Sequence, residues 1–361
     1  MTHRWRRPVW LLAAAGLILL GFYTLQRMNN PNLRDEARKM VETCIIIRNE
    51  LRPWEQARHA EPSEAEVRYA GHFDLPNEGV THRLGAIQFN GRPIAVQQFV
   101  PDGVPRGTVV LLHGYLDHSA VNSRAIEEFV DWGFTVVAYD MPGHGLSGGT
   151  PADIDNFTDY AEILLAVLHT VCADSAKPLH LVAHSTGAVA VLGALHQSRD
   201  EPIPDLGEVI LLAPLVHSWG ERFSAVGHAL ARPFVKRVPR IQRRVSHDEH
   251  FSRMLRHGNP LRIQLVPLHW FGELRKWQRK VRDWPPLPEI GATVIQGTED
   301  NVVAWQKNLS ALRTLLPAAQ IHTIDGAYHH LLNEDRTHRK PVYQILRKTL
   351  LKSATKPEKS K

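Results

Sequence analysis

Short apolar runs alternate with amphipathic stretches along most of the chain after residue 108. The apolar runs have the length of buried strands, and the stretches between them carry apolar residues at helical spacing. This alternation predicts a mostly parallel sheet with helices on both faces. The expected strands cover residues 109–112, 134–138, 179–183, 209–212, 292–295 and 320–324.

A β-hairpin is expected ahead of this series. Residues 84–89 and 94–100 have the character of strands, and Asn90-Gly91 lies between them. Asn-Gly tolerates the positive φ angles of a type I′ turn, which suits it to join two antiparallel strands. Further upstream, the apolar positions between residues 31 and 60 predict an amphipathic helix.

The N-terminal segment contains a candidate membrane anchor. Arg4, Arg6 and Arg7 precede an uncharged apolar run from Val9 to Leu25. The run is just long enough to cross a bilayer as a helix. A cleaved signal peptide is the alternative, but no small-x-small cleavage site follows the run, so we favour an uncleaved single-pass anchor. We expect a bacterial inner-membrane protein with its main domain periplasmic, although basic residues after the run leave the orientation open.

Composition narrows the partners. The formal net charge of +6 and the pI near 9.4 suit either nucleic acid or an anionic membrane surface. No nucleic-acid motif is visible, so we expect the membrane and no nucleic acid. The two cysteines, Cys44 and Cys172, lack metal-type spacing, and the glycine-rich loop at 139–148 lacks G-x-G-x-x-G. We therefore expect no metal and no cofactor, and a structural role for that loop and its His144.

The strongest chemical signal surrounds Ser185. An apolar strand candidate ends at Ala183-His184, Ser185 follows, and helical spacing resumes after Thr186-Gly187. Small residues on both sides of a serine are typical of a nucleophile elbow, where the strained turn leaves no room for larger ones. The alternative is an ordinary strand followed by a helix that Ser185 caps.

A loop that would stabilise an oxyanion follows the strand at 109–112. It begins with His113-Gly114, and a glycine there lets a backbone N–H approach a substrate oxygen closely. We expect the N–H groups of Tyr115 and Thr186 to form the oxyanion hole. A plain strand-terminating turn is the alternative.

A serine nucleophile needs a general base and an orienting carboxylate, in the chain order serine, acid, histidine on this type of sheet. The loop after residues 292–295 offers Asp300 and, as the rival, Glu299. The loop after residues 320–324 offers His329 and, as the rival, His330. We favour Asp300 and His329.

Taken together, these residues resemble the α/β-hydrolase superfamily, in particular its monoacylglycerol lipase and lysophospholipase-like group, also called the serine aminopeptidase S33 or hydrolase-4 group. The motifs that carry the resemblance are His113-Gly114 with 117–119, Asp140 with 143–147, the elbow at 183–187, 297–300 and Gly326-Ala327-Tyr328-His329. The resemblance implies metal-free hydrolysis of fatty-acyl or similar esters. It also implies His329 rather than His330 as the base. Ala183 in place of the first elbow glycine and the large Tyr115 and Leu116 after His-Gly depart from the family pattern.

The α/β alternation lapses between residues 215 and 288, where we expect a helical cap over the site, as the resemblance also implies. The cap is basic, with clusters at 232–244 and 275–282 that form either a solvated face or a contact with anionic lipid. The expected divisions are an anchor at 1–27, a helical linker at 28–80, a first core part at 81–215, the cap at 216–288, a second core part at 289–352 and a basic tail at 353–361.

The sequence therefore predicts a membrane-anchored serine ester hydrolase that acts on monoacylglycerol or lysophospholipid-like substrates. The same residues could instead act on peptides, thioesters or acyl-transfer substrates. A third hypothesis is a non-catalytic binding protein that keeps the fold. The oligomeric state is not predicted.

Overall fold

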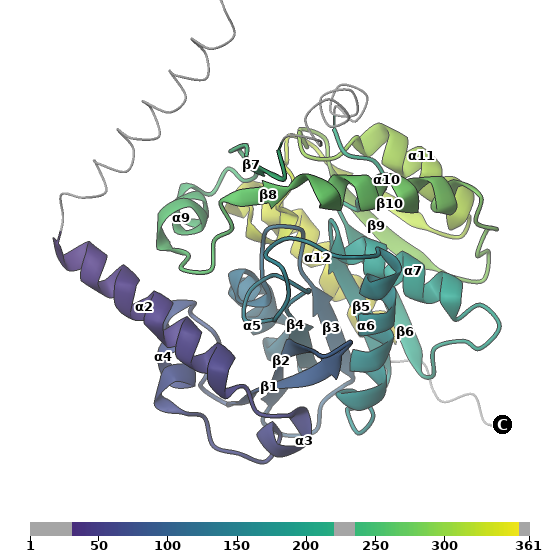
Figure 1. Ribbon diagram of the computed structural model, residues 1–361. Helices are drawn as coiled ribbons and strands as arrows, with labels where there is room; N and C mark the ends of the chain where they lie inside the picture. The colour runs from purple at the N-terminus through teal and green to yellow at the C-terminus, as the bar shows by residue number, and fades with distance from the viewer. Residues whose placement is uncertain (1–30, 220–234, 354–361) are drawn as a thin grey trace, which may run out of the picture.

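A computed structural model describes residues 31–219 and 235–353 (Figure 1). Its centre is an eight-stranded sheet in the order β1-β2-β4-β3-β5-β6-β9-β10. The strands are β1 (Val80–Phe89), β2 (Arg92–Pro101), β3 (Thr108–Leu112), β4 (Thr135–Tyr139), β5 (Leu179–His184), β6 (Leu206–Leu212), β9 (Ala292–Gly297) and β10 (Gln320–Ile324). From β4 to β10 all neighbours in the sheet are parallel, whereas β2 is antiparallel to both β1 and β4. The predicted mostly parallel sheet is thus confirmed.

The hairpin is also confirmed. Strands β1 and β2 pair from Val80 opposite Pro101 to Phe89 opposite Arg92. Asn90 and Gly91 turn between them with φ angles of 48° and 71°. Two positive φ angles in succession define the type I′ turn that the Asn-Gly pair predicted.

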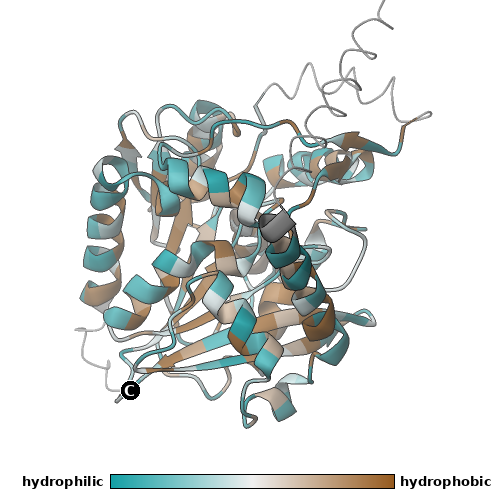
Figure 2. Cartoon of the chain, turned by 90° about the vertical axis from the view of Figure 1, so that its left-hand side faces the viewer, coloured by the Kyte–Doolittle hydropathy of each residue, from teal (hydrophilic) through white to brown (hydrophobic). Residues whose placement is uncertain are grey.

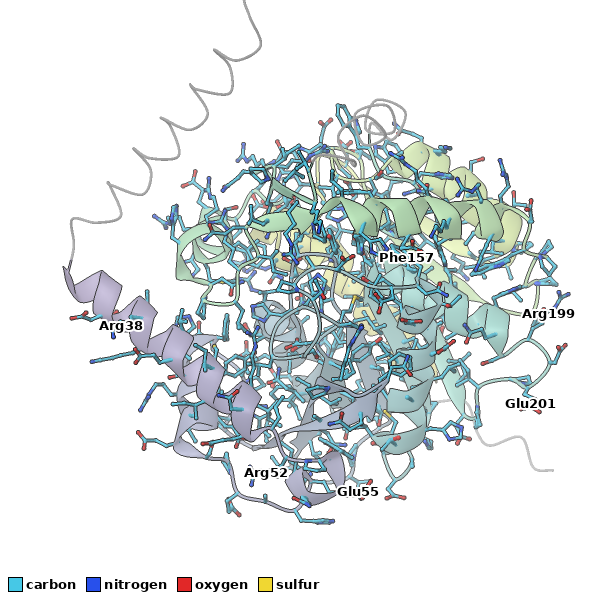
Figure 3. The ribbon with its side chains drawn as sticks, viewed as in Figure 1. Arg38, Arg52, Glu55, Phe157, Arg199 and Glu201 are labelled. Carbon is cyan, nitrogen blue, oxygen red and sulfur yellow. The ribbon has the colours of Figure 1, made fainter. Side chains whose placement is uncertain are left out.

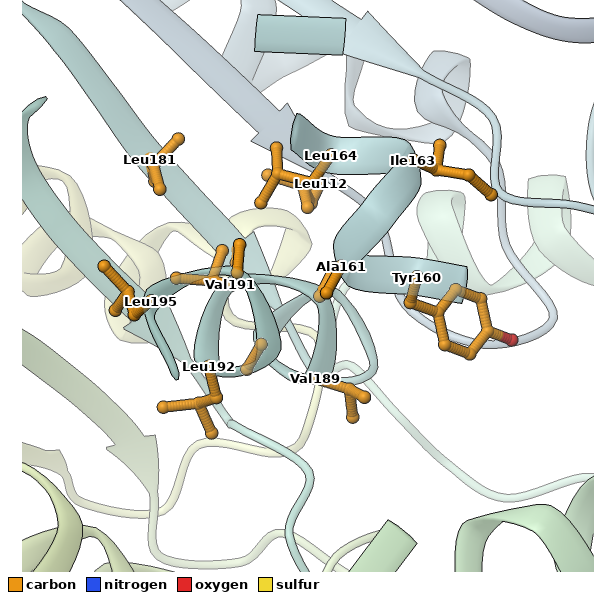
Figure 4. Packing of buried hydrophobic residues seen from close by; sticks show 14 of the residues in the cluster. Leu112, Tyr160, Ala161, Ile163, Leu164, Leu181, Val189, Val191, Leu192 and Leu195 are labelled. Carbon is orange, nitrogen blue, oxygen red and sulfur yellow. The ribbon is translucent and has the colours of Figure 1, made fainter. Parts of the chain in front are cut away.

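Alternate residues of each strand enter two different cores, one on each face of the sheet. Val110 and Leu112 of β3 pack into one cluster, and Val109 and Leu111 pack into the other. In Figure 4, Leu112 and Leu181 of the sheet lie beside the helices of the first cluster. The colouring of Figure 2 shows hydrophobic strands inside and many hydrophilic helical positions outside.

Helices cover both faces, as predicted. The first core contains side chains from α6 (Thr158–Thr170), α7 (Gly187–Gln197), α10 (Leu268–Arg282) and α11 (Trp305–Leu315). The second contains side chains from α2 (Pro31–Glu50), α4 (Glu64–His72), α5 (Ser123–Asp131) and α12 (Arg336–Ser353). Short elements complete the connections: α3 (Trp54–Ala57) and the 3-10 turns η1 (Ser119–Asn122) and η3 (Leu331–Asn333).

The N-terminal helix differs from its prediction in length and in pattern. It ends at Glu50, and Pro53 precedes the separate helix α3. Met40, Cys44 and Ile47 are buried against the body, whereas Val41 and Ile45 are 40% and 48% exposed. Helix α2 thus has a second apolar face that the body does not cover.

The insertion between β6 and β9 is not entirely helical. Its described part contains β7 (Arg237–Pro239), α9 (Glu249–Arg253), the π-helical turn η2 (Met254–Gly258), β8 (Leu265–Pro267) and α10. β7 and β8 form an antiparallel pair beside the main domain. The predicted anchor lies outside the described residues. Within residues 31–219 and 235–353, no helix combines the length and apolar character needed to cross a membrane.

Candidate active site

Ser185 lies on the sharp turn between β5 and α7. Its φ angle is 52°, a backbone conformation that a residue with a side chain adopts only where the surroundings enforce it. The Ser185 N–H donates to the Leu212 carbonyl at 2.9 Å, which holds the turn against β6. A Cβ atom on Gly187 would lie 2.8 Å from the Leu112 Cβ, so only glycine fits there. The predicted elbow geometry is therefore present.

Three side chains from distant parts of the chain meet at this turn. The Ser185 hydroxyl donates to Nε2 of His329 at 3.0 Å, and Nδ1 of His329 donates to Oδ2 of Asp300 at 2.7 Å. All three side chains are buried. This is the arrangement in which an imidazole can remove a hydroxyl proton while a carboxylate fixes its tautomer.

Asp300 is held as an anion by its neighbours. Its Oδ1 accepts hydrogen bonds from the N–H groups of Val302 at 2.8 Å and Val303 at 3.1 Å, and its Oδ2 also accepts from the Gln296 amide at 3.1 Å. Burial alone would raise the pKa of Asp300. The charge and the hydrogen bond of His329, together with the two backbone N–H groups, outweigh burial and lower that pKa below 3.8.

The rival residues do not reach Ser185. Glu299 is exposed, and only its backbone N–H joins the local network, by donating to Ala327. His330 is buried, but its Nε2 lies 3.2 Å from Oδ2 of Asp117. The geometry therefore favours Asp300 and His329 at both positions where the residues alone left a choice.

The loop after β3 lies directly against the serine. A Cβ atom on Gly114 would lie 2.9 Å from Nδ1 of His184 and 3.1 Å from the Cβ of Ser185. The backbone N–H groups of Tyr115 and Thr186 donate to no acceptor in the described ranges. They are therefore not occupied by an internal hydrogen bond, as donors to a substrate oxyanion must be, and the oxyanion hole itself stays a prediction.

The Tyr115 side chain is held by the cap. Its ring stacks on Trp270 of α10 with ring centroids 3.7 Å apart, and its hydroxyl donates to the Ala152 carbonyl at 2.7 Å. Trp270 is itself fixed by a hydrogen bond of 3.0 Å to the Tyr160 hydroxyl. The large residue after His-Gly is thus part of the interface between the core and the cap.

The loop after β4 is joined to the end of the loop after β3 through Asp140. Asp140 accepts hydrogen bonds from both the N–H and the hydroxyl of Ser119 at 2.7 Å, and from the Leu146 N–H at 2.7 Å. His144 is buried, and burial lowers its pKa to about 3. Its Nδ1 lies 2.8 Å from the Pro142 carbonyl, so the structural role predicted for this loop and for His144 agrees with its contacts.

Arginines of the insertion reach the same region. Arg240 donates to the Leu116 carbonyl at 3.2 Å, and Arg243 donates to the Asn301 carbonyl. The Arg244 guanidinium lies 5.4 Å from the centre of the Tyr328 ring. Part of the basic cluster at 232–244 therefore contacts the loops around the candidate site. Neither of the two roles expected for this cluster, a solvated face or a contact with anionic lipid, includes such contacts.

Among the residues that the structure describes, two clusters hold potential metal ligands, with ligand atoms within 4.8 Å of one another: Asp117 with His184 and His330, and His247 with Glu334 and His338. Sequence reasoning missed these clusters, and it also missed the contact of Gln296 with Asp300. Only the adjacency of Asp117, His184 and His330 to the predicted motifs was visible in the sequence.

Comparison with known proteins places this arrangement in context. The family Hydrolase_4, described as serine aminopeptidase S33, matches residues 103–336. Caffeoylshikimate esterase of Arabidopsis thaliana is 32% identical over 130 residues, which are 35% of this chain and 39% of that protein. Monoacylglycerol lipase of Mycolicibacterium smegmatis is 29% identical over 154 residues, which are 42% and 52%. The chain thus spans about two fifths to one half of these two relatives.

A solved structure extends the likeness of the fold. A soluble variant of monoglyceride lipase from Saccharomyces cerevisiae, in complex with a substrate analog, superposes with a TM-score of 0.66 at 16% identity. The superposition covers 78% of this chain and 99% of that structure. The similarity therefore extends beyond the sheet to nearly the whole of the compared structure.

Proposed function

Because this chain belongs to the serine aminopeptidase S33 (Hydrolase_4) family of α/β-hydrolases, we propose that it is a serine hydrolase of acyl esters, with monoacylglycerol or lysophospholipid-like lipids as substrates. The observation that carries the proposal is the contact chain from Ser185 through His329 to Asp300. The names of similar proteins, among them monoacylglycerol lipases and esterases, support the ester class.

In the proposed reaction, His329 removes the Ser185 proton as the oxygen attacks the acyl carbonyl. Asp300 keeps Nδ1 of the imidazole protonated and stabilises the imidazolium that forms. The N–H groups of Tyr115 and Thr186 bind the oxyanion of the tetrahedral intermediate. His329 then donates its proton to the leaving alcohol, and water, activated by the same imidazole, releases the acid from the acyl-enzyme.

The test of the substrate class is side-by-side turnover of four compounds. A monoacylglycerol, a lysophospholipid, an acyl thioester and an aminoacyl arylamide are each offered to the intact protein and to Ser185→Ala. We expect the two lipid esters to be hydrolysed fastest, and the Ser185→Ala rate to fall by about 10⁶-fold. A faster arylamide or thioester reaction would move the proposal to peptide or thioester chemistry.

We further propose that the apolar run from Val9 to Leu25 anchors the protein in a bacterial inner membrane with the catalytic domain periplasmic, beside anionic lipid. The support is the length of the run and its leading arginines. The test is alkaline extraction of membranes followed by protease treatment of intact spheroplasts. Resistance to extraction with cleavage from outside is the expected result, and release into the soluble fraction would contradict it.

A further inference from the structure

A groove of about 530 Å³ lies between α2 and the chain that leads into β8. Val41, Ile45 and Arg48 of α2 line one side, and residues 260–265 line the other. Residues of the loop after β4, between Gly143 and Pro151, also line it, together with Cys44 and Arg237. In Figure 1 these elements lie on the side of the molecule where α2 begins.

The groove is lined in part by apolar side chains that no other part of the described structure covers. Val41 and Ile45 are four residues apart, so both side chains lie on one face of α2, and both are exposed. Leu265 on the opposite side is 49% exposed. Together with Leu261 and Ile263 they line the groove with hydrocarbon. Exposed apolar side chains that gather around a concave surface indicate a ligand rather than ordinary surface composition.

The same groove carries cationic side chains. Arg48, Arg237 and Arg262 line it, and no aspartate or glutamate is among its described lining residues. The Arg48 guanidinium donates to the Gly145 carbonyl, which holds it at the groove. Guanidinium groups bind phosphate oxygens in a fixed, bidentate geometry. The combination of hydrocarbon and guanidinium suits an amphiphile with an anionic head.

The groove lies close in sequence to the predicted membrane anchor, so the membrane is the source of amphiphile that fits it. The apolar run ends at Leu25, and α2 begins at Pro31. A fully extended chain of six residues reaches about 20 Å, and the ten residues of helix from Pro31 to Val41 add about 15 Å. The groove is therefore within reach of a bilayer in which the run is inserted.

We propose that this groove binds an anionic phospholipid of the membrane surface, with its phosphate on Arg48 and Arg237 and its hydrocarbon against Val41, Ile45 and Leu265. The proposal deepens the membrane association of the proposed function and rests on it for the source of the lipid. The groove also adjoins the segment that holds the Tyr115 ring, because Pro151 lines it and the next residue, Ala152, accepts the hydrogen bond of the Tyr115 hydroxyl. A bound lipid would therefore orient the site toward the membrane.

The experiment follows the thermal unfolding midpoint of the intact chain in neutral detergent micelles as phosphatidylglycerol is added. Phosphatidylcholine and inorganic phosphate are added in parallel, because they carry the hydrocarbon without net charge and the charge without hydrocarbon. Binding to the folded state raises the midpoint, and its concentration dependence gives the affinity. The variants are Arg48→Gln, Arg237→Gln, their combination and Ile45→Glu.

Two matched variants serve as controls. Arg199→Gln removes an exposed charge at the end of the molecule far from α2 (Figure 3). Val67→Glu places a carboxylate at an exposed apolar position on α4, where Val67 is 58% exposed. Both leave the groove intact and should respond to phosphatidylglycerol as the natural chain does.

We expect phosphatidylglycerol alone to raise the midpoint. Each arginine variant should weaken its affinity roughly fivefold, and the double variant roughly 25-fold. An unchanged response in the double variant, or equal responses to phosphatidylglycerol and inorganic phosphate, would overturn the proposal. Hydrolysis of a soluble short-chain ester separates this outcome from the proposed function: groove variants should retain it, and Ser185→Ala should lose it while still binding lipid.

Discussion

The Nε2 atom of His330 lies 3.2 Å from the Oδ2 atom of Asp117, and both side chains are buried. Asp117 belongs to the loop that carries Tyr115, whereas His330 directly follows His329 in the loop after β10. The pair therefore joins the loop of the proposed oxyanion donor to the loop of the proposed base. Neighbouring histidines thus have separate tasks, one at the serine and one at this link.

Replacement of Asp117 by asparagine should weaken the link without changing its shape. A hydrogen bond that involves a charged group contributes about 1.5 to 3 kcal/mol, so we expect kcat to fall tenfold or more with little change in KM. The measurement is steady-state hydrolysis of a short-chain ester. Asp131→Asn, at an exposed position at the end of α5, is the control. Equal kinetics of the two variants would show that the pair does not position the site.

The stability of the protein should depend on two buried carboxylates at acidic pH. Burial alone would raise the pKa of Asp117, but the hydrogen bond and charge of His330 outweigh it, and the pKa of Asp117 falls well below 3.8. The pKa of Asp300 is lowered in the same sense. A carboxyl group with a lowered pKa binds fewer protons when folded than when unfolded, so its contribution is present above the unfolded value and is lost as the pH falls toward the folded one.

We therefore expect the contribution of these two carboxylates to the free energy of unfolding to be constant above about pH 5 and to decline steadily below about pH 4. This decline adds to an earlier one, which begins below about pH 6.5, because buried histidines with lowered pKa values such as His144 take up protons only in the unfolded chain. Urea unfolding at a series of pH values measures this. Asp117→Asn should show a lower plateau and a shallower decline, because one of the two titrating groups is gone. A decline of unchanged steepness would assign the acid sensitivity to other residues.

The choice between Asp300 and Glu299 gives a sharp kinetic contrast. Asp300 contacts His329, whereas the Glu299 side chain is exposed. Loss of the orienting carboxylate by Asp→Asn exchange costs about 10⁴-fold in kcat in a serine triad, so we expect that loss for Asp300→Asn. Glu299→Gln should change kcat less than twofold, by the ordinary behaviour of exposed side chains. The reverse order would transfer the role to Glu299.

Gly114 tests whether the loop after β3 must lie against the serine. A methyl group there would collide with His184 and Ser185, so Gly114→Ala should displace the Tyr115 N–H. Loss of one oxyanion donor costs about 10²- to 10³-fold in kcat, and we expect a loss of that size. Gly291→Ala is the control, because no heavy atom lies within 4 Å of a Cβ at that position. Hydrolysis of a soluble ester by both variants is compared, and equal rates would argue against the oxyanion role.

Much of the core was predictable because local signals and tertiary demands coincide there. The runs at β3, β4 and β5 are mostly apolar and short, which fits a buried strand better than a helix. Asn90-Gly91 determines its turn because both residues adopt positive φ angles readily. The strand at residues 320–324 was predicted to its exact bounds. The contact between Ser185 and His329 could be anticipated because chain order and flanking small residues restrict the positions that this chemistry can use.

The rest depends on contacts that sequence spacing does not encode. Asp117 and His330 are 213 residues apart, and nothing in either segment specifies its partner. The Gln296 amide contacts Asp300, four residues further on, because β9 ends at Gly297 and the chain then turns so that the carboxylate lies beside the strand's end. The exposure of the second apolar face of α2 could not be predicted either. Apolar spacing indicates that a helix face is covered, but it does not show which neighbour covers it.

The central claim is that Ser185 is the activated nucleophile of a serine hydrolase. The most direct measurement is covalent labelling of the intact protein with a fluorophosphonate probe, followed by mass spectrometry of the modified peptide. We predict that one probe molecule attaches to Ser185, that His329→Ala slows the reaction strongly, and that Ser185→Ala is not labelled. Absence of labelling of the natural chain, or equal labelling of Ser185→Ala, would contradict the account.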